Sequence, residues 1–372
     1  MNMNSSKTQY FNSLTGLRFL AATLVFIYHN RKYWRTDLHP EALRFINEFH
    51  IGVSLFFVLS GFLIAYTYKD EPLKSLQKYS QYLLLRLARI MPMYWLILTV
   101  YYLDPRFGNY KFSSLTYSLF HAFSSTRNLD GIAQAWSLNV EMCFYLLAPL
   151  FFLLLRKRYI YFITALLFVF ATTVLVGVIW NYYGNPNHFF TPVKFVVNGT
   201  FAGRSVQFLT GMLLAYGLRE NKFTFFFRIK RKTLWGFFAL LIITYSIGLF
   251  EKNIYVSGDE TVPGMILHAL ILPFGIAFII TGLMTEKTWI QKFFGSRFLV
   301  LLGNASFTFY LIHISYVNLK IKPFILLPDR NFVLLWVLSV VIYLLIEKPM
   351  YSLCRKWINK IPVLLSTVKT QL

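Results

Sequence analysis

The 372-residue chain is 56% hydrophobic and 19% aromatic, and only 14% of its residues are charged. A soluble domain has about a quarter of its residues charged, and the apolar residues here form long runs, so the composition excludes a soluble globular protein and predicts a polytopic membrane protein. The formal net charge of +22 comes mostly from short links between these runs, without interleaved base-stacking aromatics, so membrane topology explains it and no nucleic-acid partner is expected.

Ten apolar segments are candidates for membrane-spanning helices, each of which needs about 20 residues. An all-α bundle follows, because backbone polar groups in lipid must be satisfied within each segment. The sixth segment is short. The segments are 14–30, 50–68, 81–103, 136–155, 160–180, 203–218, 234–250, 262–284, 298–318 and 331–347.

An even number of spans places both termini on one side of the membrane. If that side is the cytoplasm, the inner links contain "RKR" (156–158) and "RIKRK" (228–232), and the tail contains "CRKWINK". This excess of positive charge predicts cytoplasmic termini, although the first outer link is itself basic. We therefore expect a cytoplasmic leader (1–13), a transmembrane domain of about ten helices (14–348) and a basic cytoplasmic tail (349–372). The first apolar run has no A-x-A-like cleavage site and is interpreted as a retained span.

The first span, "LRFLAATLVFIYHN" (17–30), contains Arg18 and His29. Ionisable groups inside a membrane are costly and mark functional sites by default. At 3.6 residues per turn the two lie on one helix face, about 16 Å apart along the axis. This geometry suits an elongated anion that enters from the cytosol with its reactive end at His29. The structural alternative places Arg18 among lipid headgroups and His29 in a hydrogen bond at the outer interface.

Arg86 and Arg89, in "RLARIMPMYW", stand at i and i+3 near the cytosolic end of the third span and share a face. Two guanidiniums on one face can bind a phosphate in bidentate fashion. Because Arg18 is expected at the same depth, we predict that the three arginines form one anion site. The alternative is a positive-inside anchor for lipid headgroups.

Glu141, in "AWSLNVEMCFYLLAP", is the only carboxylate well inside a predicted span. The topology places it in the outer half of the membrane, near the depth of His29. A carboxylate beside an imidazole fixes its tautomer and stabilises the imidazolium, so we predict a Glu141–His29 pair. In the alternative, Glu141 pairs with an arginine and holds two helices together.

These segments resemble the acyltransferase 3 family of integral membrane O-acyltransferases, in family order over nearly the whole chain. The first four matches are Arg-x10-His at Arg18 and His29, FFxLSGF at 56–62, Arg-x-x-Arg at Arg86 and Arg89, and Trp-Ser-Leu-x-x-Glu-x-x-Phe-Tyr at 136–145. The later matches are Arg-x-x-x-Phe-x-x-Gly at Arg204, Phe208 and Gly211, and the closing segments "LGNASFTFYLIH" (302–313) and "IEKP" (346–349).

The resemblance implies O-acylation of a sugar hydroxyl on an extracytoplasmic glycan or glycolipid by a multi-pass protein of the cytoplasmic (inner) membrane. The donor it implies is cytosolic acyl-CoA, in most members acetyl-CoA, and no metal is expected. The resemblance is to the stand-alone form of the family, without an SGNH-hydrolase-like domain. Either the bundle completes the transfer alone or a separate extracytoplasmic transferase does.

The expected roles follow the path of the donor. Arg18, Arg86 and Arg89 hold its phosphates or upper arm, and its thioester reaches His29. The histidine then acts as general base toward the acceptor hydroxyl, or attacks the thioester and forms an acyl-imidazole; the sequence leaves both routes open. The candidate substrate-binding residues are Trp136, Tyr145, Arg204 and His313.

Three further residues are candidates for the cavity wall. Ser60 and Tyr310 are expected to help line it, while Ser60 with Gly61 is explained more simply by close helix packing. His313 fits the site and a satisfied interface histidine equally well.

Two other functional classes are compatible with buried charges. A transporter or flippase for a glycolipid or small anion often has paired spans broken by Gly or Pro in two related halves, and no such pairing is visible here. A sensor or scaffold in cell-envelope assembly would not require a histidine and a carboxylate at one depth. The pattern therefore favours an enzyme.

Overall fold

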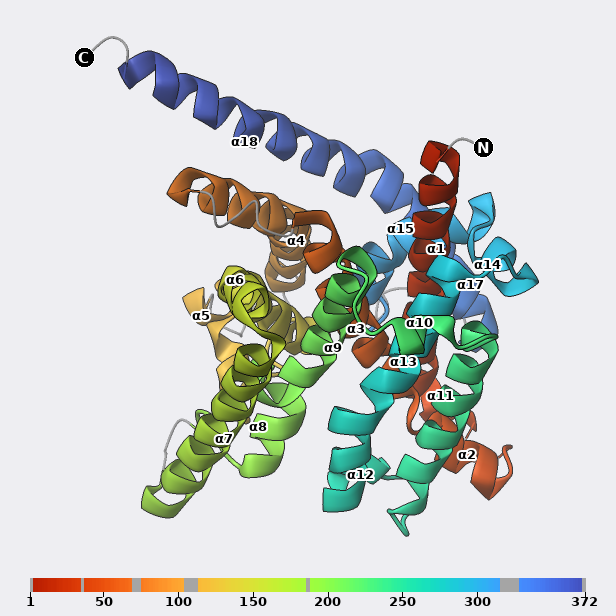
Figure 1. The fold of residues 1–372 in the computed structure, drawn as a ribbon. Helices are drawn as coiled ribbons and strands as arrows, with labels where there is room; N and C mark the ends of the chain where they lie inside the picture. The colour runs from red at the N-terminus through yellow and green to blue at the C-terminus, as the bar shows by residue number, and fades with distance from the viewer. Residues whose placement is uncertain are drawn as a thin grey trace.

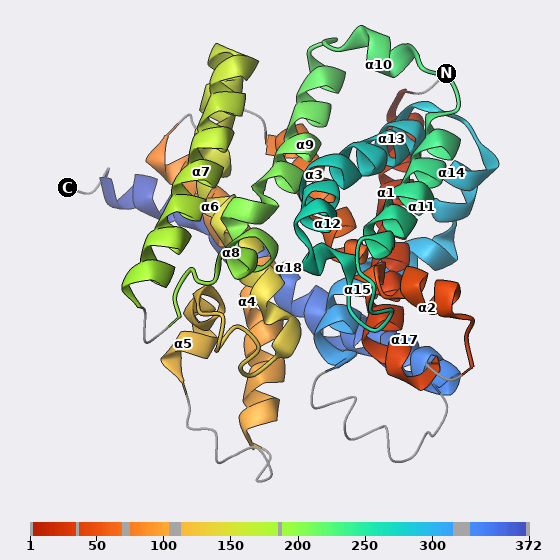
Figure 2. The same cartoon turned by 90° about the horizontal axis from the view of Figure 1, so that it is seen from below.

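The protein is described by a computed structural model that covers residues 3–34, 37–68, 75–103, 113–184, 188–314 and 328–369. Within these ranges the regular elements are all helical. Both main views show the helices gathered around α1, α3 and α9, with α6 and α7 on one side and α11 and α14 on the other (Figures 1 and 2). The α-helices are α1 (Met3–Asn30), α2 (Pro40–Ile46), α3 (Gly52–Tyr68), α4 (Leu76–Leu103), α5 (Ser114–Tyr117), α6 (Trp136–Lys157), α7 (Tyr159–Tyr183), α8 (Val193–Gly199), α9 (Phe201–Arg219), α10 (Thr224–Arg228), α11 (Lys232–Leu249), α12 (Val262–Ile266), α13 (Leu272–Thr285), α14 (Trp289–Phe294), α15 (Arg297–Ile312), α17 (Pro328–Ile342) and α18 (Lys348–Lys369).

Among the described residues, eight helical segments are long and apolar enough to cross a membrane. They confirm the predicted all-α polytopic bundle and coincide with eight of the ten expected spans. The eight segments are Phe11–Tyr33, Pro40–Tyr68, Leu76–Leu103, Ala133–Leu155, Tyr159–Tyr183, Lys232–Leu249, Val262–Thr285 and Asn331–Lys360.

The other two expected spans, 203–218 and 298–318, correspond to α9 and α15. Helix α15 is apolar but has only 16 residues, and positions 315–318 of the expected span lie outside the described residues. Helix α9 is polar for a span, yet most of its side chains are buried, including those of Arg204, Ser205 and Gln207. A helix enclosed by other helices meets little lipid and does not need an apolar surface.

Helices α3 and α9 pack with their backbones almost touching. A Cβ atom added to Gly61 would lie 1.9 Å from the carbonyl oxygen of Phe208, and one added to Gly211 would lie 2.1 Å from that of Val58. Only glycine permits so close an approach. This confirms the packing role expected for Gly61 and fixes the neighbouring Ser60 against the bundle interior.

A carboxylate at the end of α13 caps the start of α11. Glu286 accepts hydrogen bonds from the backbone N–H groups of Lys232 (2.6 Å) and Thr233 (3.1 Å) and from the Thr233 hydroxyl (2.8 Å). Partial burial would raise the pKa of Glu286, but the hydrogen bonds from Thr233 and Lys232 outweigh it and lower the pKa below its ordinary value. The ionised carboxylate therefore stabilises the N-terminus of α11.

The chain directions of the central helices give the bundle two distinct ends. Figure 1 shows α18 and the start of α1 at one end, here called the terminal end, and α2 and α12 at the other, the far end. Helix α3 runs antiparallel to α1, because the Tyr66 ring contacts Phe11 (5.4 Å between centroids) while Gly52 packs on Ala21. Helix α15 runs parallel to α1.

Candidate active site

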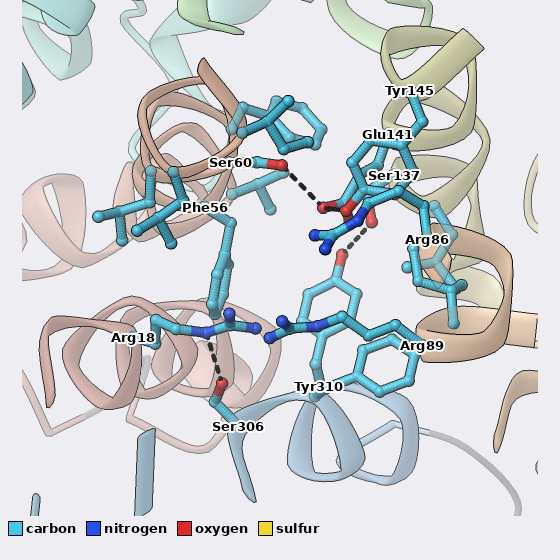
Figure 3. Close-up of a pocket in the computed structure, with 18 of the residues that line it drawn as sticks. Arg18, Phe56, Ser60, Arg86, Arg89, Ser137, Glu141, Tyr145, Ser306 and Tyr310 are labelled. Atoms are coloured by element: carbon cyan, nitrogen blue, oxygen red, sulfur yellow. Dashed lines mark hydrogen bonds between the residues drawn. The ribbon is translucent and has the colours of Figure 1, made fainter. Parts of the chain in front are cut away.

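A cavity of about 260 Å³ lies between α1, α3, α4, α6 and α15. Val53 and Tyr310 line its far-end part, and Thr67 lines its terminal-end part, as the helix directions require. The expected wall positions of Ser60 and Tyr310 are confirmed (Figure 3). The polar lining residues are Arg18, Ser60, Thr67, Tyr68, Arg86, Arg89, Ser137, Glu141, Tyr145, Ser306 and Tyr310.

Three guanidinium groups converge on this cavity. Arg18 comes from α1 and donates from Nε to Ser306 Oγ (3.3 Å), and Arg86 comes from α4 and donates from Nη2 to the Tyr68 hydroxyl (2.5 Å). Figure 3 shows the guanidiniums of Arg18 and Arg89 pointing toward one another. Like charges this close are unfavourable unless an anion joins them, so the structure brings the three predicted anion-binding residues into one site.

Glu141 supplies the one carboxylate among the lining residues. Its Oε1 accepts hydrogen bonds from Ser60 Oγ (3.0 Å) and from the Tyr145 hydroxyl. The predicted Glu141–His29 pair is therefore wrong: the carboxylate is held by α3 and α6 inside the cavity. Equal depth estimated from residue counts on two separate helices does not bring two side chains together, because the tilt and rotation of the helices decide the contact.

His29 instead pairs with a second histidine. Its Nδ1 lies 3.0 Å from Nε2 of His313, and Nδ1 of His313 lies 2.8 Å from the carbonyl oxygen of Tyr310. A carbonyl only accepts, so His313 carries a proton on Nδ1 and, in its neutral form, a lone pair on Nε2. His29 must then donate from Nδ1, which leaves the lone pair of its Nε2 available as a base.

The histidine pair lies beyond the far-end wall of the cavity, and His29 is not among the lining residues. Tyr310 connects the two parts, because its ring lines the cavity while its carbonyl accepts from His313 one helical turn later. The rings of Phe56 and Tyr310 meet edge to face at 6.1 Å between centroids at this wall. The histidine pair therefore lies outside the set of residues that line the cavity, and Tyr310 is the residue that connects the two.

Comparison with known proteins decides the family. The sequence profile of the acyltransferase domain of the acyltransferase 3 family matches residues 11–347. The chain belongs to this family. The eight helical segments that are long and apolar enough to cross a membrane agree with a multi-pass membrane protein of this family.

Curated relatives carry names that agree with this acyltransferase assignment. Proteins of Staphylococcus aureus strains COL and MSSA476, provisionally named O-acetyltransferases, are 24% identical over 350 residues, 84% of this chain and 51% of theirs. Acyltransferase MdmB of Streptomyces mycarofaciens is 30% identical over 159 residues, 39% of this chain and 40% of that protein. The match to the Staphylococcus aureus proteins covers most of this chain. The chain thus spans about half the length of those relatives. No solved structure has significant similarity to it.

The four predicted substrate-binding residues are distributed over three places. Tyr145 lines the cavity, and His313 pairs with His29. Arg204 and Trp136 lie elsewhere, with the guanidinium carbon 5.7 Å from the centroid of the indole ring. The Nε atom of Arg204 donates to the Asn198 carbonyl (2.7 Å), so the backbone of α8 fixes this arginine.

Sequence reasoning missed two groups of buried polar residues. Glu347 ends a π-helical turn (Tyr343–Glu347), accepts a hydrogen bond from Thr308 and interacts electrostatically with Arg89 and Arg18. Glu347 lies in the segment "IEKP" (346–349). Its position at the end of an apolar run could have indicated a buried carboxylate. The second group, His50, Asp259 and His268, comes from segments more than 200 positions apart in the chain, and no local pattern joins them.

Asp259 of this second group is ionised in the folded protein. Burial would raise the pKa of its carboxyl, but the imidazoles of His50 and His268 beside it hold that pKa well below its usual range. The carboxylate oxygen Oδ2 lies 3.0 Å from Nε2 of His50 and 3.3 Å from Nδ1 of His268. The far end of the bundle therefore contains a second polar centre besides the cavity.

Proposed function

We propose that the protein transfers an acyl group, in the simplest case acetyl, from acyl-CoA to a sugar hydroxyl of an extracytoplasmic glycan or glycolipid. The observation that carries this proposal is a cavity with three guanidiniums and one carboxylate, one aromatic wall away from an imidazole with a free lone pair. The family and the names of the relatives support acyl transfer. The protein would lie in the inner membrane, with the terminal end of the bundle facing the cytoplasm.

The donor would enter from the terminal end with its charged part in the cavity. Arg18, Arg86 and Arg89 match phosphate groups in charge and in donor geometry. The thioester would lie farther along, because the 11 positions between Arg18 and His29 correspond to about 16 Å along α1. To reach His29 the pantetheine arm would pass between the rings of Phe56 and Tyr310.

The chemical step would use Nε2 of His29. As a general base it takes the proton of the acceptor hydroxyl while the hydroxyl oxygen attacks the thioester carbonyl carbon. The carbon–sulfur bond then breaks, and the imidazolium returns the proton to the departing thiolate. In the second route Nε2 itself attacks the acyl carbon and the carbon–sulfur bond breaks, which gives an acyl-imidazolium and the thiolate. The sugar hydroxyl then attacks the acyl carbon, the carbon–nitrogen bond breaks, and the hydroxyl proton passes to the thiolate.

His313 would be the positioning residue in either route. By accepting a hydrogen bond from the N–H of His29 Nδ1, it holds the ring in the tautomer that both routes need, as the carboxylate does in a hydrolase triad. Glu141 would have a different task from the one expected of it. With Ser60 and Tyr145 it partly offsets the charge of the arginines and fixes the shape of the cavity.

The test uses purified full-length protein in detergent with acetyl-CoA labelled in the acyl group and an envelope glycan fraction as acceptor. His29→Ala should abolish both thioester turnover and labelling of the glycan. His121→Gln is the matched control, since His121 is a buried histidine that contacts the carbonyl of Leu115 and lies outside the cavity. Full turnover in His29→Ala would refute the proposal, whereas donor binding without turnover by the wild type would favour a transporter.

A further inference from the structure

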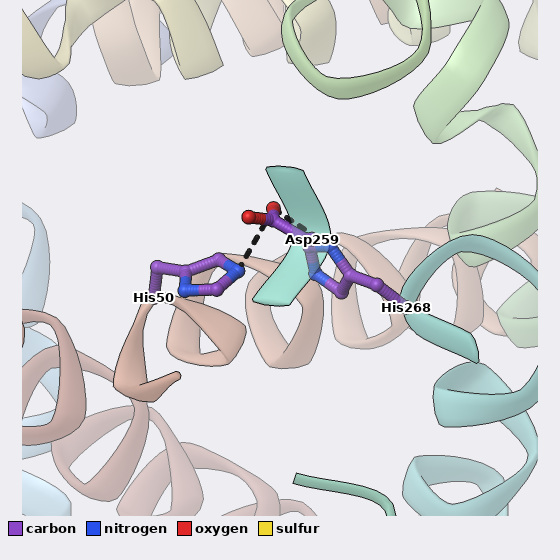
Figure 4. A group of neighbouring side chains, drawn as sticks. All are labelled: His50, Asp259 and His268. Carbon is purple, nitrogen blue, oxygen red and sulfur yellow. Dashed lines mark ion pairs between the residues drawn. The ribbon is translucent and has the colours of Figure 1, made fainter. Parts of the chain in front are cut away.

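His50, Asp259 and His268 converge at the far end of the bundle, outside the cavity (Figure 4). They come from a short helical turn before α3 (Phe49–Ile51), a turn between α11 and α12 (Gly258–Glu260) and a π-helical turn before α13 (Leu267–Ile271). We infer that these three side chains form a binding site for a divalent metal ion of the zinc class. The inference does not depend on the proposed function.

The distances between the ligand atoms fit one shared ion. Zinc binds imidazole nitrogen and carboxylate oxygen at about 2.0–2.2 Å, and in a tetrahedral site neighbouring ligand atoms are then about 3.3 Å apart. Asp259 Oδ2 lies 3.0 Å from His50 Nε2 and 3.3 Å from His268 Nδ1. All three atoms lie within 4.8 Å of one another. Two nitrogens and one carboxylate oxygen are a ligand set of zinc and its neighbours, and they are not the oxygen shell that Mg²⁺ or Ca²⁺ prefers.

The side chain of His50 turns Nε2 toward the carboxylate of Asp259. Its Nδ1 contacts the carbonyl oxygen of Asn47 (3.4 Å), and its Nε2 lies 3.0 Å from Asp259 Oδ2. Without a metal, a protonated His50 forms an ion pair with Asp259 across this distance. A metal ion bound to the neutral ring would take the place of that proton.

Each imidazole also has a second partner on its other nitrogen. Nδ1 of His50 lies 3.4 Å from the carbonyl oxygen of Asn47, and Nε2 of His268 lies 2.9 Å from Ser54 Oγ. Metal-binding histidines usually have such a partner, because it fixes the tautomer and aims the other nitrogen at the ion. Both rings are thus held with their remaining nitrogen toward Asp259.

The guanidinium of Arg204 lies next to His268, so a bound metal ion has to be compatible with this positive charge. Nη1 of Arg204 is 2.9 Å from Nε2 and 3.2 Å from Nδ1 of His268. A single atom this close to both ring nitrogens lies over the face of the ring, outside the directions of their lone pairs, so it does not block coordination. The two buried carboxylates, Asp259 and Glu48, outnumber this one guanidinium.

The experiment is metal binding by the full-length protein in detergent, purified with a tag that contains no histidine. The protein is treated with a chelator, dialysed against micromolar Zn²⁺ and analysed for bound metal; Co²⁺ is then added in place of Zn²⁺ and followed by its visible absorption. We expect about one equivalent of Zn²⁺ per chain and absorption typical of four-coordinate Co²⁺. His50→Gln and Asp259→Asn should each reduce bound metal at least about tenfold, while the exposed-site control His188→Gln should not.

Three results would overturn the inference. The first is a wild-type protein that retains no more metal than a buffer control, and the second is undiminished binding in both variants. Should the variants fail to fold, the wild type alone decides: Cu²⁺ bound to protein labelled with ¹⁵N-histidine should show coupling to imidazole nitrogen in electron paramagnetic resonance. Absence of that coupling is the third.

Discussion

Replacement of His313 tests the tautomer argument most directly. The His29 Nδ1–His313 Nε2 hydrogen bond of 3.0 Å is the contact that orients the proposed base, and the Tyr310 carbonyl fixes the proton of His313. His313→Leu removes the acceptor but leaves an apolar side chain in a buried position. His29 can then rotate, and its proton can move to Nε2, the atom that must accept.

The expected effect falls on kcat. Loss of the orienting partner in a hydrolase triad costs up to about 10⁴ in kcat, and general-base catalysis as a whole contributes about 10²–10⁴. We therefore expect kcat to fall about 10²–10⁴-fold, which corresponds to about 3–5 kcal/mol in the activation barrier. KM for acyl-CoA should stay within about twofold, because His313 is not part of the cavity that holds the arginines.

The assay is steady-state release of CoA by detergent-purified protein at several acyl-CoA concentrations with the glycan fraction in excess. His313→Gln should recover part of the lost rate, since its side-chain oxygen can accept from His29 Nδ1. Variants are compared only where gel filtration and thermal unfolding match the wild type. A His313→Leu protein with kcat within about threefold of wild type, or with its whole defect in KM, would refute the reasoning.

Three further predictions follow from contacts elsewhere in the chain. Arg89→Gln should raise the KM for acyl-CoA about tenfold with little change in kcat, and an unchanged KM would return this arginine to a lipid-anchoring role. Gly61→Ala should destabilise the protein by about 1–3 kcal/mol in thermal unfolding, because its Cβ would lie 1.9 Å from a carbonyl oxygen of α9, whereas at Gly275 the nearest atom would be 3.5 Å away and alanine should be tolerated. Glu286→Gln should lower stability by about 1 kcal/mol at neutral pH. Since the folded pKa of Glu286 is depressed, this difference should be present above the unfolded value near 4.3 and vanish as pH falls through the folded pKa, and a constant difference down to pH 3 would contradict it.

The sequence predicted the membrane-spanning helices well where the helices face lipid. Helix α7, for example, exposes Leu167 and Phe168 and follows from its apolar run alone. Helix α9 was the weakest prediction, because burial among other helices removes the need for an apolar surface. Hydrophobicity indicates which helices contact lipid. It therefore does not identify helices that have little contact with lipid.

The candidate site was predictable in part for a related reason. Arg86 and Arg89 share a face by helical spacing, and Arg18 was expected at the same depth, so the meeting of the three guanidiniums could be anticipated. The partner of His29 could not, because the register between α1, α6 and α15 depends on tilt and close packing that no single helix encodes. His313 stood four positions after Phe309 in a quoted motif, but nothing in that motif distinguished it from Glu141 as the partner of His29.

The burial of Arg204 and Gln207 in α9 has a consequence for biogenesis. Charged and polar side chains raise the free energy of inserting an isolated helix into a bilayer, and α9 has Arg204 in its first turn and Gln207 three positions later. We therefore expect α9 to insert more favourably against α3, made about 150 positions earlier, whose Gly61 meets Gly211 and Phe208. Membrane integration of α9 is then coupled to its packing against α3. The order in which the two helices are synthesised therefore matters for assembly of the bundle.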